Sequence, residues 1–293
     1  MNNKTIPKIT FISSMTIFGT LALFIRNISL PSAEIALYRA LIAILLIGTY
    51  LLVRKQKIPF GEAKKELPLL LASGIAMGIN WIFLFEAYRY TSVSTATLSY
   101  YFAPVIVTVA SPFIFKEKLC AKQILCFVMS TVGIVLITGV SSLQGGSDII
   151  GILLGLGAAV FYATVILINK FIKSVDGINR TFLQFISSTF VLIPYVLLGE
   201  GINVASIGSV ALICLLVVGI VHTAITYCMY FSSIKELSGQ SVAILSYIDP
   251  LVAVAISVIF LNEKMNVWQY LGGALILGFT LLNELPSKRK NNK

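Results

Sequence analysis

The chain consists mainly of apolar blocks of about twenty residues, and this pattern limits its fold more than any other feature. Hydrophobic residues make up 57% of the 293 residues, and charged residues only 12%, where a soluble domain has about 25%. A helix of about 20 apolar residues crosses a bilayer, whereas a lone strand leaves its backbone unsatisfied in lipid. The sequence therefore predicts an all-α integral membrane protein.

Blocks of this kind predict ten transmembrane helices, an even number that places both termini on the same side of the membrane. The connections between them are short, so no separate soluble domain is expected. The helices are predicted over residues 9–27, 33–53, 67–87, 92–115, 121–139, 149–170, 181–199, 208–231, 239–261 and 267–283.

The basic residues predict how the chain is oriented. With the N-terminus inside, the inner segments hold clusters such as RKQK at 54–57 and KRK at 288–290, and the outer segments hold only Arg26, Arg89 and Lys264. Inner loops of membrane proteins are enriched in Lys and Arg. We therefore expect a multi-pass protein of the plasma or inner membrane with both termini in the cytoplasm. Clusters between apolar blocks also argue against a nucleic-acid partner, despite a net charge of +10.

A repeated motif divides the chain into two halves, predicted as repeats over residues 1–140 and 141–293. ATLSYYFAP at 96–104 aligns without a gap with VAILSYIDP at 242–250. Each half holds five predicted spans, so the second half inserts upside down relative to the first. Many secondary transporters are built this way and hold substrate near the midplane, at the repeat interface. We predict two inverted five-helix repeats around a central cavity, forming one transport unit.

The motif places a proline at the same position of each repeat, Pro104 and Pro250. Proline lacks the backbone donor and breaks a helix, and matching broken spans mark the substrate site of many transporters. We expect both helices to be broken there, beside a cavity that solvates the freed carbonyls. Glu117 and Glu263 also align, and we interpret both as neutralising a lysine or a helix end.

Three features resemble the drug/metabolite transporter superfamily, and specifically its EamA-type ten-helix carriers. They are LYRALIAILL at 37–46, FEAYRYTSVSTATLSYYFAP at 85–104, and the repeated Pro-then-Glu pattern. The resemblance implies a basket of helices around a cavity, alternating access, and export or exchange of amino acids, amines or other metabolites. The repeats differ where the first has Ala103 and the second has Asp249, so the halves are chemically unequal.

Four ionisable residues fall within or at the ends of predicted spans: Arg39, Glu86, His222 and Asp249. A charge at the bilayer centre costs about 2.5–3.5 kcal/mol on insertion scales, so such groups usually face a cavity and are paired. Asp249 and His222 have similar predicted depths, and we expect them to share the cavity and couple transport to protons, with Glu86 as a further proton-coupling residue. The alternative is a neutral histidine bound to a helix carbonyl and an aspartate that caps the broken helix.

Arg39 and Glu86 lie at similar predicted depths near the outer ends of neighbouring spans, which predicts an ion pair. The pair would act as a structural clamp or as an outer gate. A competing interpretation places Glu86 in the cavity, in contact with the solute.

Deep polar and aromatic side chains are expected to bind the solute together with Asp249. They lie too deep to be interfacial anchors, and aromatic faces attract organic cations, so an amine-bearing or zwitterionic solute is favoured; core packing is the alternative. The predicted group comprises Asn80, Trp81, Tyr100, Tyr101, Tyr227 and Tyr247.

The chain lacks the G-x-x-x-x-G-K-[ST] loop, H-E-x-x-H and G-x-S-x-G, so no ATP-driven pumping or common hydrolase chemistry is predicted. A single histidine excludes a multi-histidine metal site, and no cofactor is expected. The predicted partners are a small solute, the lipid bilayer and protons as coupling ion, for a monomer or homodimer.

These features predict a secondary active transporter, not an enzyme, that exports or exchanges an amino acid, amine or similar solute. Proton-coupled import of a cationic amine such as choline is the alternative within this class. A passive channel or an intramembrane enzyme are the alternatives from other classes, and the enzyme would have only His222 as an imidazole base.

Overall fold

The computed structural model describes residues 5–55, 60–115, 121–141, 146–175, 177–199, 201–203, 205, 207–234, 236–237 and 245–285. Within these ranges the chain is helical and contains no strand. The first half comprises α1 (Thr5–Gly19), α2 (Leu21–Ile25), α3 (Ser32–Val53), α4 (Phe60–Tyr90), α5 (Val93–Tyr100), α6 (Ala103–Phe115) and α7 (Ala121–Ser141).

The second half comprises α8 (Gly146–Asn169), α9 (Gly177–Leu198), α10 (Ser209–Val217), the π-helix η2 (Val218–Ile225), α11 (Thr226–Ile234), α13 (Ile248–Ile259) and α14 (Val267–Glu284). Among the described residues, seven segments are long and apolar enough to cross a membrane: Thr5–Ile25, Ser32–Val53, Lys64–Tyr90, Val93–Ala110, Asp148–Asn169, Gly177–Leu198 and Ser209–Tyr230. Ala121–Leu136, Ile248–Ile259 and Val267–Asn283 are apolar but shorter. The chain is therefore an all-α protein with multiple membrane-span candidates, while the number ten stays a prediction.

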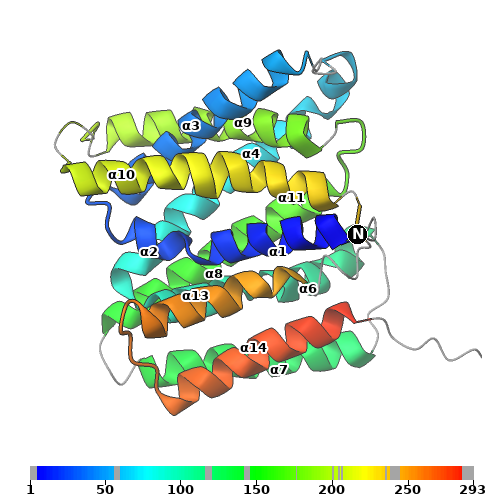
Figure 1. The fold of residues 1–293 in the computed structure, drawn as a ribbon. Coiled ribbons are helices and arrows are strands. Elements are labelled where there is room, and N and C mark those ends of the chain that lie inside the picture. Colours follow the sequence, from blue (N-terminus) through cyan, green and yellow to red (C-terminus); the bar gives the residue numbers. More distant parts are fainter. Residues whose placement is uncertain are drawn as a thin grey trace, which may run out of the picture.

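The two halves are interleaved in one bundle (Figure 1). α4 packs against α8 and α9, α7 lies beside α14, and α1 contacts α11 and α13. α1 begins and α14 ends on the same side of the bundle. Since the helices of one half pack largely on those of the other, the predicted repeats build a single body.

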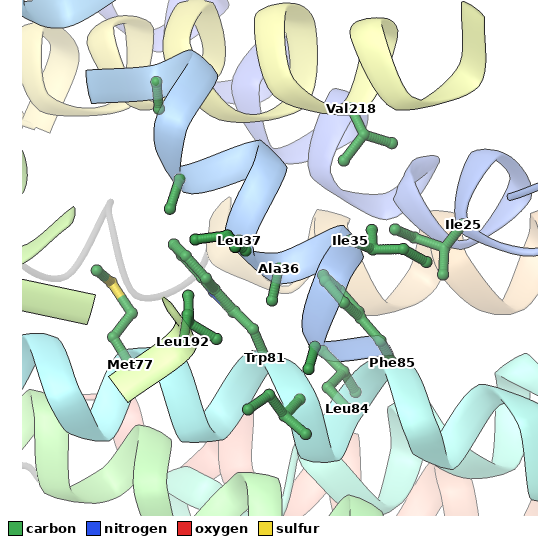
Figure 2. Packing of buried hydrophobic residues seen from close by; sticks show 14 of the residues in the cluster. Ile25, Ile35, Ala36, Leu37, Met77, Trp81, Leu84, Phe85, Leu192 and Val218 are labelled. Atoms are coloured by element: carbon green, nitrogen blue, oxygen red, sulfur yellow. The ribbon is translucent and has the colours of Figure 1, made fainter. Parts of the chain in front are cut away.

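The main buried cluster lies where α3 crosses α4, with Leu192 of α9 and Val218 of η2 completing it. Figure 2 shows Trp81 and Phe85 reaching from α4 toward α3. On another side of α4, Gly74 allows a close approach to α9, because an added Cβ would overlap the Gln184 carbonyl oxygen and the Ser187 side chain. α3, α4 and α9 therefore pack tightly against one another next to the centre of the bundle.

Both aligned prolines coincide with helix breaks. α5 ends at Tyr100, and Pro104 is the second residue of α6; Tyr247 precedes α13, and Pro250 is its third residue. Proline is tolerated in a first turn because the N–H that it lacks would have no intrahelical acceptor there. The broken spans thus meet the centre of the bundle at a turn and not as a continuous helix, as expected of helices that border a cavity.

Candidate functional site

A cavity of about 530 Å³ lies between the two halves. Its described lining comes from α1, α4, the α5–α6 break, α6, α8, α9, α11, and the start of α13 with the residues just before it. The structure brings together every residue of the predicted solute-binding group, and also Pro104. These residues are Asn80, Trp81, Tyr100, Tyr101, Tyr227, Tyr247 and Asp249.

Asp249 is the only charged side chain among the described residues that line the cavity. It lies in the first turn of α13, and the Tyr101 hydroxyl donates a hydrogen bond to its Oδ2. Tyr101 occupies the break of the first repeat and Asp249 the break of the second. This hydrogen bond therefore joins the two broken helices, and the second carboxylate oxygen has no partner among the described residues.

Aromatic rings form much of the wall around this carboxylate. The ring of Tyr100 lies 5.6 Å from that of Tyr101 and 5.2 Å from that of Tyr162. Phe18 and Tyr227 meet edge to face at 5.2 Å. Such faces attract an organic cation. Tyr162 and the further lining residue Tyr230 are absent from the predicted set, although both are tyrosines within predicted spans.

Uncharged amides form another part of the wall, and the sequence interpretation included only Asn80 of them. The Gln184 Nε2 group donates to Ser73 Oγ at 2.6 Å and to Asn169 Oδ1 at 2.8 Å, and Gln184 and Asn169 both line the cavity. Asn80 Nδ2 donates to the Ala158 carbonyl at 2.6 Å. Gln184 lies inside a predicted span, so a search for uncharged polar residues in the spans would have found it.

Arg39 does not pair with Glu86, so that prediction is wrong. Arg39 is 2% exposed, donates from Nε to Thr223 Oγ1 at 3.0 Å, and lies 4.4 Å above the Trp81 ring. Glu86 instead accepts from Ser32 Oγ at 2.5 Å. The guanidinium sits at the level of Trp81, and Glu86 is five residues further along α4, about 7.5 Å along the axis.

Glu86 also lies outside the central cavity. It lines a second pocket, of about 490 Å³, together with Ser32 and Glu34, and it forms an ion pair with Arg89 at 3.4 Å. The structure thus does not support contact between Glu86 and a solute in the central cavity.

His222 does not share the cavity with Asp249, which corrects the prediction. The imidazole is buried in η2, with Nε2 3.0 Å from Thr20 Oγ1 and Nδ1 3.4 Å from the Val217 carbonyl oxygen. Its ring packs against Phe24 at 4.9 Å. Depth along a span does not tell which way a side chain faces, and here the ring faces α2. This arrangement matches the alternative of a structural histidine bound to a helix carbonyl.

One end of the bundle is closed by polar contacts around Glu263. Its Oε1 forms an ion pair with Arg26 at 2.8 Å and accepts from the Val93 backbone N–H at 3.0 Å, and Ser257 donates to its Oε2. Ser257 and Ser94 are also hydrogen-bonded through their hydroxyls. Glu263 thus caps α5, consistent with its interpretation as neutralising a helix end, whereas its predicted counterpart Glu117 lies outside the described residues.

The cavity is displaced away from this closed end. On α1 the cavity is lined by Met15 and Phe18, which precede Arg26 in the chain. On α4 it is lined by Asn80 and Trp81, which precede Thr91. Thr91 belongs to the closed end, because its carbonyl oxygen accepts from Arg26 at 3.0 Å. Along α5 and α6 it follows the break and lies beyond Val93. Each of these elements therefore places its cavity residues toward the same, opposite end of the bundle.

Both halves match one sequence family, described as the EamA-like transporter family, over residues 6–139 and 149–284. The chain belongs to this family. The resemblance drawn from the sequence is thereby confirmed, and EamA-like membership identifies a membrane transporter.

Relatives of this EamA-like chain carry transporter names. It is 30% identical over 291 residues to the Bacillus subtilis uncharacterized transporter YxxF, covering 99% of this chain and 93% of the relative. It is 24% identical over 258 residues to the Escherichia coli uncharacterized inner membrane transporter YhbE, covering 83% and 79%.

A solved crystal structure superimposes with a TM-score of 0.66 at 16% identity, over 96% of this chain and 98% of that one. At this identity the similarity establishes a shared fold. The helical fold of this chain therefore occurs in an experimentally solved protein.

Proposed function

We propose that the protein is a secondary active transporter that carries a small amine-bearing solute across the cell membrane by alternating access. The observation that carries the proposal is Asp249, a carboxylate at a helix break inside an aromatic-lined cavity with a single described hydrogen-bond partner. In a cavity within the membrane, such a carboxylate attracts a proton or a cation. An ammonium group satisfies both the charge and the surrounding tyrosine faces.

The closed end and the displaced cavity support alternating access. Contacts of Arg26, Ser94, Ser257 and Glu263 join three spans at one end, and the cavity extends toward the other. With the positive-inside orientation, the cavity faces the cytoplasm. Counting α7, α13 and α14 with the seven longer segments gives ten spans, five in each inverted repeat, and these repeats would exchange their open and closed ends during transport.

Proton coupling is the simplest mechanism for Asp249, because one carboxylate can bind a proton or an ammonium ion but not both. Release of the cation toward one side and protonation from that side would then exchange solute for protons. With protons entering, this cycle exports the amine. His222 and Glu86 do not take part, since neither lines the cavity.

Transport in proteoliposomes tests the proposal. A pH gradient should drive a labelled amine across the membrane in the direction opposite to the protons. Asp249→Asn should lower this proton-driven rate at least tenfold, because the neutral amide cannot exchange a proton. Asp148→Asn is the matched control, since Asp148 lies in the first turn of α8, outside the described cavity lining. Normal gradient-driven transport by Asp249→Asn, in protein that reaches the membrane, would refute the mechanism.

A further inference from the structure

Each side-chain amide in the cavity wall uses one of its two polar atoms in a hydrogen bond to the protein and leaves the other without a described partner. The Gln184 Nε2 group donates to Ser73 and Asn169, while no described residue donates to its Oε1. Asn169 Oδ1 is occupied by Gln184, and its Nδ2 has no acceptor among the described residues. Gln184 is 4% exposed and lines the cavity with Asn169. In the part of the chain that the structure describes, an acceptor and a donor without a protein partner are therefore left on neighbouring side chains for a ligand.

Asn80 adds a second acceptor to this wall. Its Nδ2 is fixed by the Ala158 carbonyl at 2.6 Å, and the side chain is 3% exposed and lines the cavity. Within the described part of the chain, no donor reaches its Oδ1. Neither this oxygen nor Gln184 Oε1 is among the fully buried polar atoms that lack a partner, so both are open to the cavity, and a hydrogen bond from a ligand contributes about 0.5–1.5 kcal/mol net. A ligand that pairs these atoms is therefore favoured over one that leaves them empty.

The charges of the cavity wall also disfavour a solute that carries a carboxylate. The described lining contains no Lys, Arg or His, and its one charge is the Asp249 carboxylate. Arg39, the nearby buried cation, is covered by Trp81, whose ring stacks on the guanidinium at 4.4 Å. A carboxylate on the solute would thus meet neutral amides and no cation, and would lose its hydration without an ion pair.

The nature of the ammonium group is also restricted. Asp249 Oδ2 already accepts from Tyr101, and a second hydrogen bond to this carboxylate requires an N–H on the solute. Charge-assisted hydrogen bonds are roughly twice as strong as neutral ones. A quaternary ammonium ion has no N–H, so it would gain only the attraction of the aromatic faces.

We infer that the solute combines an N–H-bearing ammonium group, held by Asp249, with a neutral hydroxyl or carboxamide, held by Gln184, Asn169 and Asn80. Amino amides and amino alcohols therefore bind better than the corresponding amino acids and quaternary amines. The inference rests on the proposed function, since it assigns the solute class of that transporter.

A matched ligand series tests the inference on the full-length purified protein by calorimetric titration. The series is butylamine, 4-aminobutanamide, 4-aminobutanoate and the N-trimethylated form of 4-aminobutanamide. We expect 4-aminobutanamide to bind about three- to tenfold more tightly than butylamine, as one net hydrogen bond predicts. The other two should bind more weakly than 4-aminobutanamide.

Equal or tighter binding of 4-aminobutanoate or the N-trimethylated amide would overturn the inference and leave the proposed function intact. Failure of all four ligands to bind, or unchanged binding of butylamine by Asp249→Asn, would instead overturn the proposed function. The two failures are therefore distinguishable in one experiment.

A variant assigns the preference to the amide wall. Gln184→Met keeps the side-chain length and removes both the acceptor and the donor of the amide. We expect the ratio of 4-aminobutanamide affinity to butylamine affinity to fall from about three- to tenfold in the wild type to about one in this variant. An equal loss for both ligands would show a merely structural role and overturn the assignment. If this variant fails to fold, Asn169→Leu gives the same readout, because Asn169 supplies the free donor.

Discussion

At the residue scale, the most unusual group is Arg39, a guanidinium buried within a predicted span. Among the described residues no carboxylate lies within ion-pair distance of it, and its contacts are Thr223 and the rings of Trp81 and Phe85. Stacking of this kind depends on the planar guanidinium, which lysine lacks. Arg39 therefore contributes to packing through its shape as much as through its charge.

Two substitutions at Arg39 separate these contributions. Arg39→Met removes a buried charge that has no acidic partner and keeps the apolar contact with Trp81, so we expect thermal stability close to wild type. Arg39→Lys keeps the charge but loses the stacked plane, and should lose roughly 1–3 kcal/mol. Thermal unfolding in detergent measures both, and a Lys variant more stable than the Met variant would contradict this view.

Residue identity predicted the members of the cavity better than it predicted their pairing. Aspartate and deep tyrosines beside a proline are unusual enough in an apolar span to mark the cavity, and Asp249 and Tyr101 do line it. The Arg39–Glu86 and Asp249–His222 pairs failed because depth along a helix leaves the direction of each side chain open. That direction is set by packing, as for His222 against Phe24.

At the scale of elements, the aligned prolines predicted both helix breaks, but no sequence signal predicted the π-helix η2. Breaks follow from the missing backbone donor of proline. The hydroxyls of Thr223 in η2 and of Thr226, the residue that follows η2, donate to carbonyls five residues earlier, those of Val218 and Val221. Hydrophobic periodicity does not encode this local change of hydrogen-bond register.

The cap of α5 should control access to the closed end. Glu263→Gln removes the ion pair with Arg26. The Glu263 side chain is only 9% exposed, so this pair is largely shielded from solvent. We expect the free energy needed to open this end of the bundle to fall by about 1–2 kcal/mol. A Val93→Cys thiol should then be labelled roughly tenfold faster. The thiol is introduced with the four native cysteines replaced by alanine, and its reaction with a maleimide is timed in vesicles.

Arg89→Gln is the matched control, because it breaks an ion pair with Glu86 that is more exposed, at 55% and 27%. Exposed pairs contribute about 0–1 kcal/mol, so its labelling rate should stay within about twofold of wild type. Equal acceleration by both variants would show that Glu263 acts only as a general surface charge.

At the scale of the whole molecule, the basic residues predict that the open end faces the cytoplasm. A Val107→Cys thiol on the cavity wall should then react with an impermeant maleimide at least tenfold faster in inside-out than in right-side-out vesicles. Val93→Cys at the closed end should react slowly in inside-out vesicles. The reverse pattern would place both termini outside the cell.

The interleaved repeats also affect the order in which the chain is made. Asn80 is synthesised long before Ala158, whose carbonyl accepts its amide hydrogen bond, and α4 emerges before α8 and α9, against which it packs. While the ribosome is still translating the second half, the first repeat stays in or beside the insertion machinery, and the polar groups that later bond to the second repeat have no partner. Biogenesis of this protein is therefore most vulnerable at mid-length, when the nascent chain has many membrane helices but not yet a core.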